Sequence, residues 1–402
     1  MKNKPTLKSL IQKLIFILLC LFLSSTQLMA ESAWKPDYEL AKKLLALTES
    51  EIESSFNSMV LKQDRANYAV MVSWRLVYKL RELGKARVFL KIAESELQNN
   101  LSDNRNWATY HMLKMSIAES SYDRNNVIKH GVESLAFVKK AGDWDVKWHS
   151  YLLRSISDAF YTLGDYTNSA SYAKEMAELA RQAKYDGIEA DALFYIAESK
   201  YKLSELESAK IYANKSFKLY EKLGNTTGLG HSSKVLGSIY AANGEREKSK
   251  ESFLAAIHQY KKVKNHHGVA NCNFNLGIMH RRSKDYGEAL MYLEDAAYHF
   301  MQSGSASGAG MAKMEQGKVH DDMGELDRAI ILYEEAKILL NKTHSLDRVA
   351  QLDTYYGGYY LKVGQKEASR KSYINALKIY RNSNNKKMIR KLETYLNKLD
   401  AK

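Results

Sequence analysis

A repeat of forty residues is the feature that most constrains the fold of this chain. The repeat is marked by glycines separated by 80, 80, 80 and 40 residues: Gly84, Gly164, Gly244, Gly324 and Gly364. Three other residues hold the intermediate positions in similar surroundings: Arg124, Ser204 and Lys284. A period of this size indicates an array of stacked units rather than one globular core.

The spacing around each mark predicts a pair of helices. A small residue stands seven positions before the mark: Ser157, Ala197, Gly237, Gly277, Gly317 and Gly357. Another stands five positions after it: Ser169, Ala209, Ser249, Ala289, Ala329 and Ser369. A bulky residue follows nine after the last four marks: Phe253, Leu293, Tyr333 and Tyr373. We expect the mark to end one helix in a left-handed conformation and the small residues to let two helices approach.

Proline is nearly absent, which favours long uninterrupted helices. The chain of 402 residues has two prolines, Pro5 and Pro36, and therefore none over residues 37–402. Because proline breaks helices and marks turns, its absence argues against a β fold rich in turns. Glycine and polar loops must then provide the turns between helices.

The motif Leu-Gly-x-x-Tyr-x-x-x-Gly-Glu at residues 236–245, with Ser249, Phe253 and Ala256, resembles the tetratricopeptide repeat. The resemblance covers nearly all of residues 68–385 and implies an all-α fold, a right-handed α-solenoid of about eight helix–turn–helix units. The chain departs from the usual tetratricopeptide repeat in two ways. Its period is 40 residues instead of the commonest 34, and the proline that usually follows the second helix is missing. Both fit the 40-residue subclass, with longer second helices. The leader described below makes the expected protein one of the exported bacterial type.

We expect the array, residues 67–385, to be closed at both ends. Residues 31–66 predict a leading helix, with helical character over 37–62. Residues 386–402 predict a basic amphipathic capping helix, whose apolar stripe is Ile389, Leu392, Leu396 and Leu399. The alternative for this stripe is a membrane-surface or coiled-coil helix, but a solenoid requires a cap.

Residues 1–30 have the pattern of a secretory signal peptide. Lysines precede an apolar stretch at residues 14–23, and Leu28-Met29-Ala30 offers a cleavage site. The alternative is an uncleaved anchor, although the apolar stretch is short for a membrane span. We therefore expect a periplasmic protein whose mature part keeps one cysteine, Cys272, as a buried apolar side chain.

The positive charge is concentrated at the two ends. Of the formal net charge of +14, the leader carries +4 and residues 371–402 carry +7, which leaves +3 for residues 31–370. This distribution argues against nucleic acid as a partner, because that would need a basic stripe along the array. The basic C-terminal tip suggests at most weak contact with anionic lipid or an acidic partner.

The sequence contains no nucleotide-binding or hydrolase motif, so we expect neither an enzyme nor a cofactor. His266 and His267 are expected to be an exposed pair in a loop, not metal ligands, and no metal site is predicted. His280 and His320 occupy positions that hold tyrosine in other units and are expected to be packing residues.

In the family that this chain resembles, the first helix of each unit lines a concave groove that binds extended peptides or helices. The groove candidates by position in the repeat are Arg154, Asp158, Tyr161, Phe194, Glu198, Tyr201, Lys234, Asn271, Asn275, Arg281, Arg282 and Lys318. Amides at Asn271 and Asn275 suit an extended backbone, and the neighbouring cations suit a carboxylate. The resemblance to members that clamp a carboxylate is partial, because not all clamp positions are filled.

These observations support two hypotheses. The first is a non-catalytic periplasmic scaffold that binds a protein or peptide segment in the groove, with a few aromatic and arginine anchors. The second is a sensor that acts on a separate membrane signalling receptor, because exported arrays of this kind resemble the input regions of some bacterial regulators.

Overall fold

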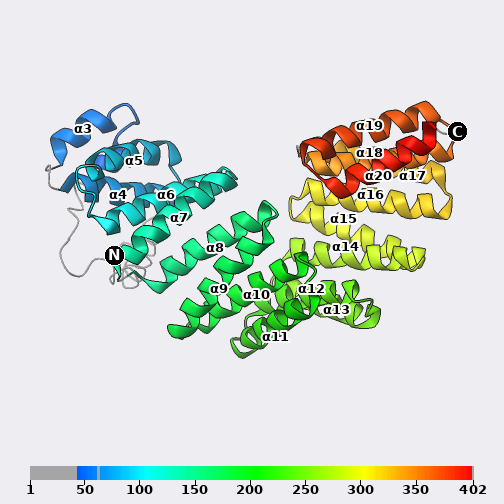
Figure 1. Ribbon diagram of the computed structural model, residues 1–402, viewed down its shortest axis with the longest axis horizontal. Helices are drawn as coiled ribbons and strands as arrows, with labels where there is room; N and C mark the ends of the chain where they lie inside the picture. The colour runs from blue at the N-terminus through cyan, green and yellow to red at the C-terminus, as the bar shows by residue number, and fades with distance from the viewer. Residues whose placement is uncertain (1–42, 61–63, 143, 344, 401–402) are drawn as a thin grey trace, which may run out of the picture. The chain divides into compact units, whose positions relative to one another are not determined.

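The computed structural model describes residues 43–60, 64–142, 144–343 and 345–400, and these ranges contain helices and no strand (Figure 1). The chain forms two compact units, residues 1–195 and 196–402, whose boundary falls within one helix. The predicted signal peptide lies outside the described residues.

The first unit holds α3 (Ile52–Met59), α4 (Arg65–Arg75) with the π-helical turn η3 (Leu76–Leu80), α5 (Leu83–Leu97), α6 (Asn104–Ser120), α7 (Arg124–Ala141), α8 (Val146–Thr162), α9 (Tyr166–Gln182) and the start of α10 (Asp186–Lys202). The second unit holds the rest of α10, α11 (Leu206–Lys222), α12 (Thr226–Ala242), α13 (Arg246–Lys262), α14 (His266–Arg282), α15 (Tyr286–Gln302), α16 (Ala306–Met323), α17 (Leu326–Asn341), α18 (Leu346–Lys362), α19 (Lys366–Asn382) and α20 (Lys386–Asp400). The prediction of an α-solenoid built from helical hairpins is confirmed.

One type of three-residue link joins most of the helices. At the end of α8, Gly164 has φ 84° and the Asp165 N–H donates to the Phe160 carbonyl at 2.9 Å. The Asp165 side chain then accepts from the backbone N–H of Asn168, so one residue completes the C-terminal cap of α8 and begins α9. Because the link satisfies backbone groups of both helices, it needs no proline.

The left-handed residue of this link recurs every 20 residues at Gly164, Lys184, Ser204, Gly224, Gly244, Lys264, Lys284, Gly304, Gly324, Gly364 and Asn384, with position 344 outside the described residues. The 40-residue period is therefore two equal halves. Most helices from α8 to α19 have 17 residues, and the first helix of a hairpin is as long as the second. The length beyond a 34-residue repeat is shared by both helices and does not lengthen the second alone.

Two of the predicted marks are wrong. Gly84 lies inside α5, and the left-handed residue that ends the preceding helix is Arg81, with φ 60°. Arg124 is the first residue of α7, and Tyr122, with φ 56°, ends α6. The hydrogen bond that closes each helix therefore forms a few residues before the expected mark. The Asp123 N–H donates to the Ala118 carbonyl in a 6→1 bond, and the Glu82 N–H donates to the Leu76 carbonyl across the wider π-helical turn η3.

The small and bulky positions meet inside each hairpin, as the spacing predicts. A Cβ added at Gly237 would lie 2.8 Å from the Phe253 ring, and one at Gly317 would lie 2.7 Å from the Tyr333 ring. The Ser249 hydroxyl donates to the Gly237 carbonyl at 2.8 Å. The two helices therefore approach closely at the glycine, and the large side chain of the second helix covers it.

The described part of the leading segment is not one helix. Residues 43–46 are helical, 47–51 form a turn, and α3 begins at Ile52. The backbone N–H and hydroxyl of Thr48 both donate to Oε2 of Glu51, at 2.9 and 2.7 Å. This local bonding competes with the helix at the turn.

At the other end, α20 packs the predicted stripe against α19. Leu392 is fully buried in a cluster with Tyr373, Leu377 and Tyr380, and Ile389, Leu396 and Leu399 pack at its edge. This packing covers the last hairpin. Among the described residues, no helix is both long and apolar enough to cross a membrane.

Candidate functional site

The first helices of successive hairpins in the second unit lie next to one another. Helix α12 contacts α14, α14 contacts α16, and α16 contacts α18 (Figure 1). We call the surface of these four helices and the end of α10 the first-helix face. Most of the predicted binding residues lie on it: Glu198, Tyr201, Lys234, Asn271, Asn275, Arg281, Arg282 and Lys318.

Three of these residues line one open pocket of about 470 Å³, which we call the Tyr201 pocket. Tyr201, Asn275 and Arg282 come from α10, α14 and the end of α14, and the other lining residues are Ser238, Ala241, Ala242, Gly244, Arg246, Phe253, Ile278, Met279 and Ser283. The lining combines apolar side chains, among them Ile278 and Met279, with Arg246 and Arg282. Such a combination suits a peptide with one apolar and one acidic side chain.

The polar groups beside this pocket are partly used within the chain. Asn271 Nδ2 donates to the His267 carbonyl at 2.9 Å, and Asn275 Nδ2 donates to the Asn271 carbonyl at 2.8 Å. Lys234 Nζ lies 3.1 Å from Glu198 Oε1, so two predicted binding residues pair with each other and join α10 to α12. The Asn271 and Asn275 amides therefore donate to backbone carbonyls of their own helix, α14.

Arg281 does not project freely from the first-helix face. Its Nη1 donates to Asp322 Oδ2 at 2.9 Å, and its Nε lies 3.3 Å from Glu315 Oε2. Glu315 is only 3% exposed, and its other oxygen accepts from the Tyr355 hydroxyl at 2.8 Å. Burial favours a lower pKa for Arg281, but Glu315 and Asp322 raise it above its ordinary value. The predicted binding residue Arg281 thus forms ion pairs that join α14 to α16.

The same network continues to α18 through Lys318 and Asp321. Lys318 Nζ lies 2.7 Å from both Asp321 Oδ2 and Asp322 Oδ1. Lys362 of α18 donates to Asp321 Oδ1 at 2.6 Å and to its carbonyl at 3.0 Å. Burial favours a higher pKa for Asp322, but Lys318 and Arg281 lower it below its ordinary value. Lys318, a predicted groove residue, thus pairs with two carboxylates of its own helix and completes this network.

Residues 231–297, which run from within α12 to within α15 and include most of the Tyr201 pocket, match the family model described as tetratricopeptide repeat. These residues form tetratricopeptide repeats. No protein with a curated description matches the chain.

Three solved structures resemble the fold at low sequence identity. The apo form of RapI has 15% identity and a TM-score of 0.54, over 84% of this chain and 97% of that one. A Rap protein complexed with competence and sporulation factor has 11% identity and a TM-score of 0.54, over 84% and 98%. The signal transduction ATPase PH0952 from Pyrococcus horikoshii, with a tetratricopeptide repeat sensor, has 14% identity and a TM-score of 0.53, over 89% and 55%. This chain thus spans about half of the length of PH0952.

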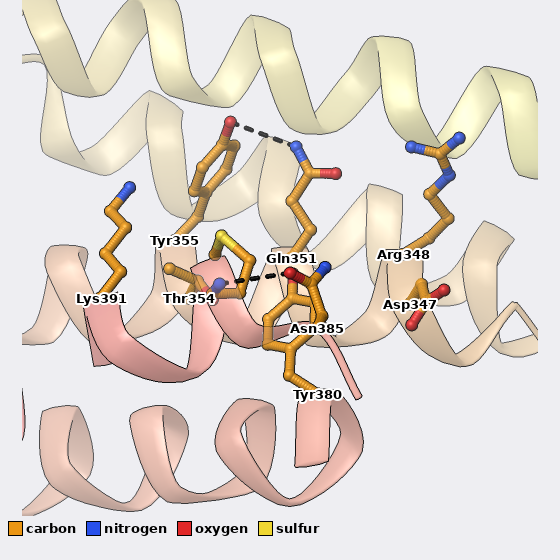
Figure 2. A pocket seen from close by; sticks show the side chains of 9 residues that line it. Asp347, Arg348, Gln351, Thr354, Tyr355, Tyr380, Asn385 and Lys391 are labelled. Carbon is orange, nitrogen blue, oxygen red and sulfur yellow. Dashed lines mark hydrogen bonds between the residues drawn. The ribbon is translucent and has the colours of Figure 1, made fainter. Parts of the chain in front are cut away.

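A second pocket lies beside the last hairpin, between α18 and α20, with a volume of about 350 Å³ (Figure 2). Its lining residues are Asp347, Arg348, Gln351, Thr354, Tyr355, Tyr380, Asn385, Met388 and Lys391. Gln351 Nε2 lies 3.4 Å from the Tyr355 hydroxyl, which is already bound to Glu315. Position in the repeat did not predict this pocket, because α20 is no longer part of the repeat pattern.

The remaining predicted residues belong to the first unit. The Arg154 guanidinium lies over the Tyr151 ring at 5.6 Å, and Tyr161 meets the Tyr166 ring edge to face at 5.3 Å. Asp158 lies 3.6 Å from Arg124. Arg154 and Tyr161 belong to the first unit and are not among the residues that line the Tyr201 pocket.

His266, Cys272 and His280 all lie on α14. His266 begins α14, and its Nδ1 lies 3.0 Å from His299 Nδ1, so the predicted loop position is wrong. His280 is buried against the Tyr292 ring, and Cys272 is fully buried, which raises the pKa of its thiol to about 12.

Sequence reasoning missed His111, His130 and Glu133, which meet in the first unit. The sequence feature that could have indicated this cluster is the spacing of His130 and Glu133, which lie one helical turn apart on α7.

Proposed function

We propose that this chain is a non-catalytic scaffold that binds a protein or peptide segment along the first-helix face. The Tyr201 pocket carries this proposal, because three residues chosen by repeat position line one open cavity there. The partner would place an apolar side chain against Ile278 and Met279, which are partly exposed, and an acidic group beside Arg282, because Arg246 already pairs with Asp285. The Rap protein complexed with competence and sporulation factor supports the proposal, since its fold is similar.

Arg282 is the best charged anchor in the pocket. It is exposed, whereas Arg281 is 18% exposed at its side chain and engaged with two carboxylates. A guanidinium at the edge of an apolar cavity binds a carboxylate in a bidentate manner and is often a hot spot. We therefore assign partner recognition to Arg282 and Tyr201, and a supporting role to Arg281.

Site-specific photocrosslinking tests this proposal. A photoreactive phenylalanine analogue replaces Tyr201 in one variant and Tyr298 in a control, because Tyr298 is 59% exposed on the second helix α15. In cells that produce the chain, we expect a discrete crosslinked protein from position 201 and none from 298. Arg282→Glu should remove the crosslink, whereas Arg328→Glu on α17 should not. Equal crosslinking from both positions, or none from 201, would exclude the Tyr201 pocket as the binding site.

We also propose that the scaffold works in the periplasm after cleavage of residues 1–30. The lysine-rich start, the short apolar stretch and Ala30 support export. N-terminal sequencing of the protein from the periplasmic fraction should give Glu31 as the first residue. A chain that begins at Met1 in the membrane fraction would indicate an anchor instead.

A sensor role is the second candidate. The similarity to PH0952, described as a protein with a tetratricopeptide repeat sensor, favours it. In this case the captured segment would change the affinity of the chain for a separate receptor. A crosslink from position 201 to a membrane receptor, present only when a small peptide is added, would favour the sensor over the scaffold.

A further inference from the structure

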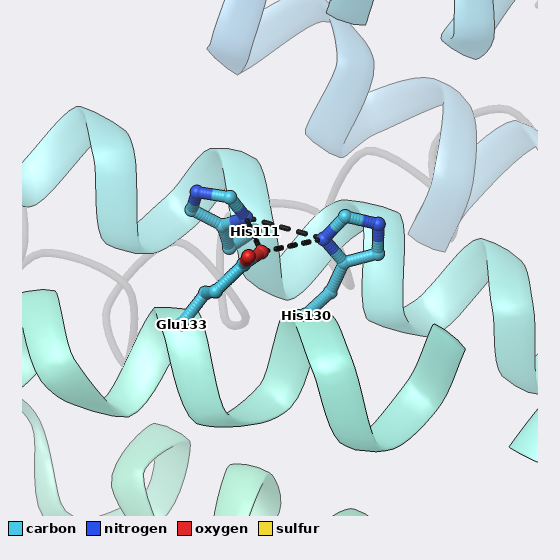
Figure 3. Close-up of side chains that lie close together, drawn as sticks. All are labelled: His111, His130 and Glu133. Atoms are coloured by element: carbon cyan, nitrogen blue, oxygen red, sulfur yellow. Dashed lines mark hydrogen bonds and ion pairs between the residues drawn. The ribbon is translucent and has the colours of Figure 1, made fainter. Parts of the chain in front are cut away.

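A cluster of three metal-ligand side chains lies in the first unit, whereas the first-helix face belongs to the second unit. His111 comes from α6, and His130 and Glu133 come from α7, the second helix of the same hairpin (Figure 3). The Nδ1 atoms of the two histidines are 3.2 Å apart. Oε2 of Glu133 lies 2.9 Å from Nδ1 of His111 and 3.0 Å from Nδ1 of His130.

Protons cannot satisfy all three contacts at once. An ionised carboxylate only accepts, and each imidazole Nδ1 carries either a proton or a lone pair. If both nitrogens carry protons, both donate to Glu133, but the two N–H groups then oppose each other across 3.2 Å. If one nitrogen lacks its proton, its lone pair faces Oε2 of Glu133 at about 3 Å. Three lone pairs that converge on one point are instead satisfied by a cation.

The distances suit a tetrahedral ion. Zn²⁺ binds histidine nitrogen and carboxylate oxygen at about 2.0–2.2 Å, which places neighbouring ligand atoms about 3.4 Å apart in a tetrahedron. The triangle of His111, His130 and Glu133 has edges of 2.9, 3.0 and 3.2 Å, so small side-chain rotations would open it sufficiently. Two imidazoles and one carboxylate are a ligand set that Zn²⁺ uses.

The surroundings hold the ligands in place. The His111 ring stacks on Phe137 at 5.7 Å and on Trp107 at 5.8 Å. At Gly131, next to His130, a Cβ would lie 2.5 Å from Ile156 and 3.2 Å from Met115 of α6, so α7 packs closely there. Both imidazole side chains are little exposed, 13% and 11%, whereas Glu133 is 39% exposed. The metal would therefore face solvent on the carboxylate side.

From this geometry we infer that His111, His130 and Glu133 bind one divalent transition-metal ion of the zinc class. The ion would link α6 to α7 and keep a fourth position for water or a side chain of a partner. The Lys114 ammonium, which donates to the Tyr110 hydroxyl at 3.1 Å, lies in the same region and weakens binding of a cation. This inference is independent of peptide binding at the Tyr201 pocket.

Metal titration of the full-length chain, purified without a polyhistidine tag and freed of metal, tests the site. Co²⁺ should bind with one ion per chain, give the visible absorption of a tetrahedral site, and be displaced by Zn²⁺. His111→Asn and His130→Asn should each weaken binding by at least about tenfold, and Glu133→Gln should also weaken it. Lys114→Gln should strengthen it, which a merely structural role of the cluster would not explain.

His299→Asn is the matched control. His266 and His299 also bring two Nδ1 atoms to 3.0 Å, but this pair has no carboxylate in a three-ligand cluster of the described residues. The control should leave Co²⁺ affinity unchanged. Circular dichroism checks that each variant is folded, and Glu133→Gln, at a half-exposed position, provides a second variant if a histidine substitution fails. Absence of binding by the wild type, or equal loss in His299→Asn and His111→Asn, would overturn the inference.

Discussion

Arg281 of α14 donates from Nη1 to Oδ2 of Asp322 on α16 at 2.9 Å, which joins consecutive repeats through residues 41 positions apart. Arg281→Ala removes one of the two cations that pair with Asp322, the other being Lys318, and leaves Glu315 buried without its cation. Loss of one member of a buried ion pair costs about 3 kcal/mol. We expect the free energy of unfolding, measured with urea, to fall by about this amount.

Arg328→Ala is the control for this prediction. Arg328 pairs with Glu325 at 3.1 Å, but the Arg328 side chain is 70% exposed. An exposed pair contributes at most about 1 kcal/mol. If Arg281→Ala is no more destabilising than Arg328→Ala, the network along α14, α16 and α18 does not stabilise the repeats.

Gly237 and Phe253 should be energetically coupled. Phe253→Ala leaves a cavity and should cost about 3–5 kcal/mol, and Gly237→Ala forces the ring aside and should cost about 1–3 kcal/mol. The repeat before this one has alanine at both equivalent positions, Ala197 and Ala213. The double variant should therefore be more stable than the sum of the single effects predicts, by about 1–2 kcal/mol.

Urea unfolding of the four proteins in this double-mutant cycle gives the coupling energy. Circular dichroism verifies that each variant keeps its helices. Strictly additive effects would show that the ring of Phe253 and the space at Gly237 do not depend on each other.

Glycine and lysine occupy equivalent left-handed positions at Gly244 and Lys284, with φ 78° and 63°. No atom lies within 4 Å of a Cβ added at Gly244, so the only energetic cost of an alanine there is its left-handed backbone conformation. Gly244→Ala should destabilise the chain by about 1 kcal/mol, and Lys284→Gly should stabilise it by a similar amount. The urea midpoints should therefore move in opposite directions, and movement in the same direction would contradict the role of φ at the link.

Asp353 of α18 gives a prediction for pH dependence. Burial raises the pKa of its carboxyl to about 6, although Lys337 opposes the shift. A carboxyl with a higher pKa in the folded state than in the unfolded chain lowers stability as pH rises from about 4 to about 6. Asp353→Asn removes this penalty and should be more stable than the wild type at pH 7 by about 1 kcal/mol, after allowance for solvent exposure.

The difference between the two proteins is the quantity to measure. Urea unfolding at pH 4.5, 5.5 and 7 should show that the advantage of Asp353→Asn grows with pH and levels off above pH 6. Parallel stability curves across this range would show that Asp353 ionises as easily in the folded chain as in the unfolded chain.

The sequence predicted the parts of the structure that depend on contacts within one hairpin. The pairing of Gly317 with Tyr333, sixteen residues later, follows from helix periodicity and one short turn. The capping stripe with Leu392 was equally visible, because a 3.6-residue period identifies an apolar face without knowledge of its partner.

The candidate site was predicted only in part. Repeat position selected Tyr201, Asn275 and Arg282, which come from α10 and α14 and line one pocket. It did not separate Arg282 from Arg281, since adjacent helical residues differ by their rotation about the helix axis, and only the neighbouring helix supplies the carboxylates that engage Arg281.

The sequence by itself therefore determined the helical hairpin, its period and its stacking, because these depend on local backbone preferences and a repeated apolar pattern. Only the tertiary structure decided which polar side chains meet a partner in the next helix. His111 and His130 are 19 residues apart, and their Nδ1 atoms converge because α6 and α7 approach closely. Such convergence depends on helix rotation and side-chain rotamers, which a sequence pattern does not specify.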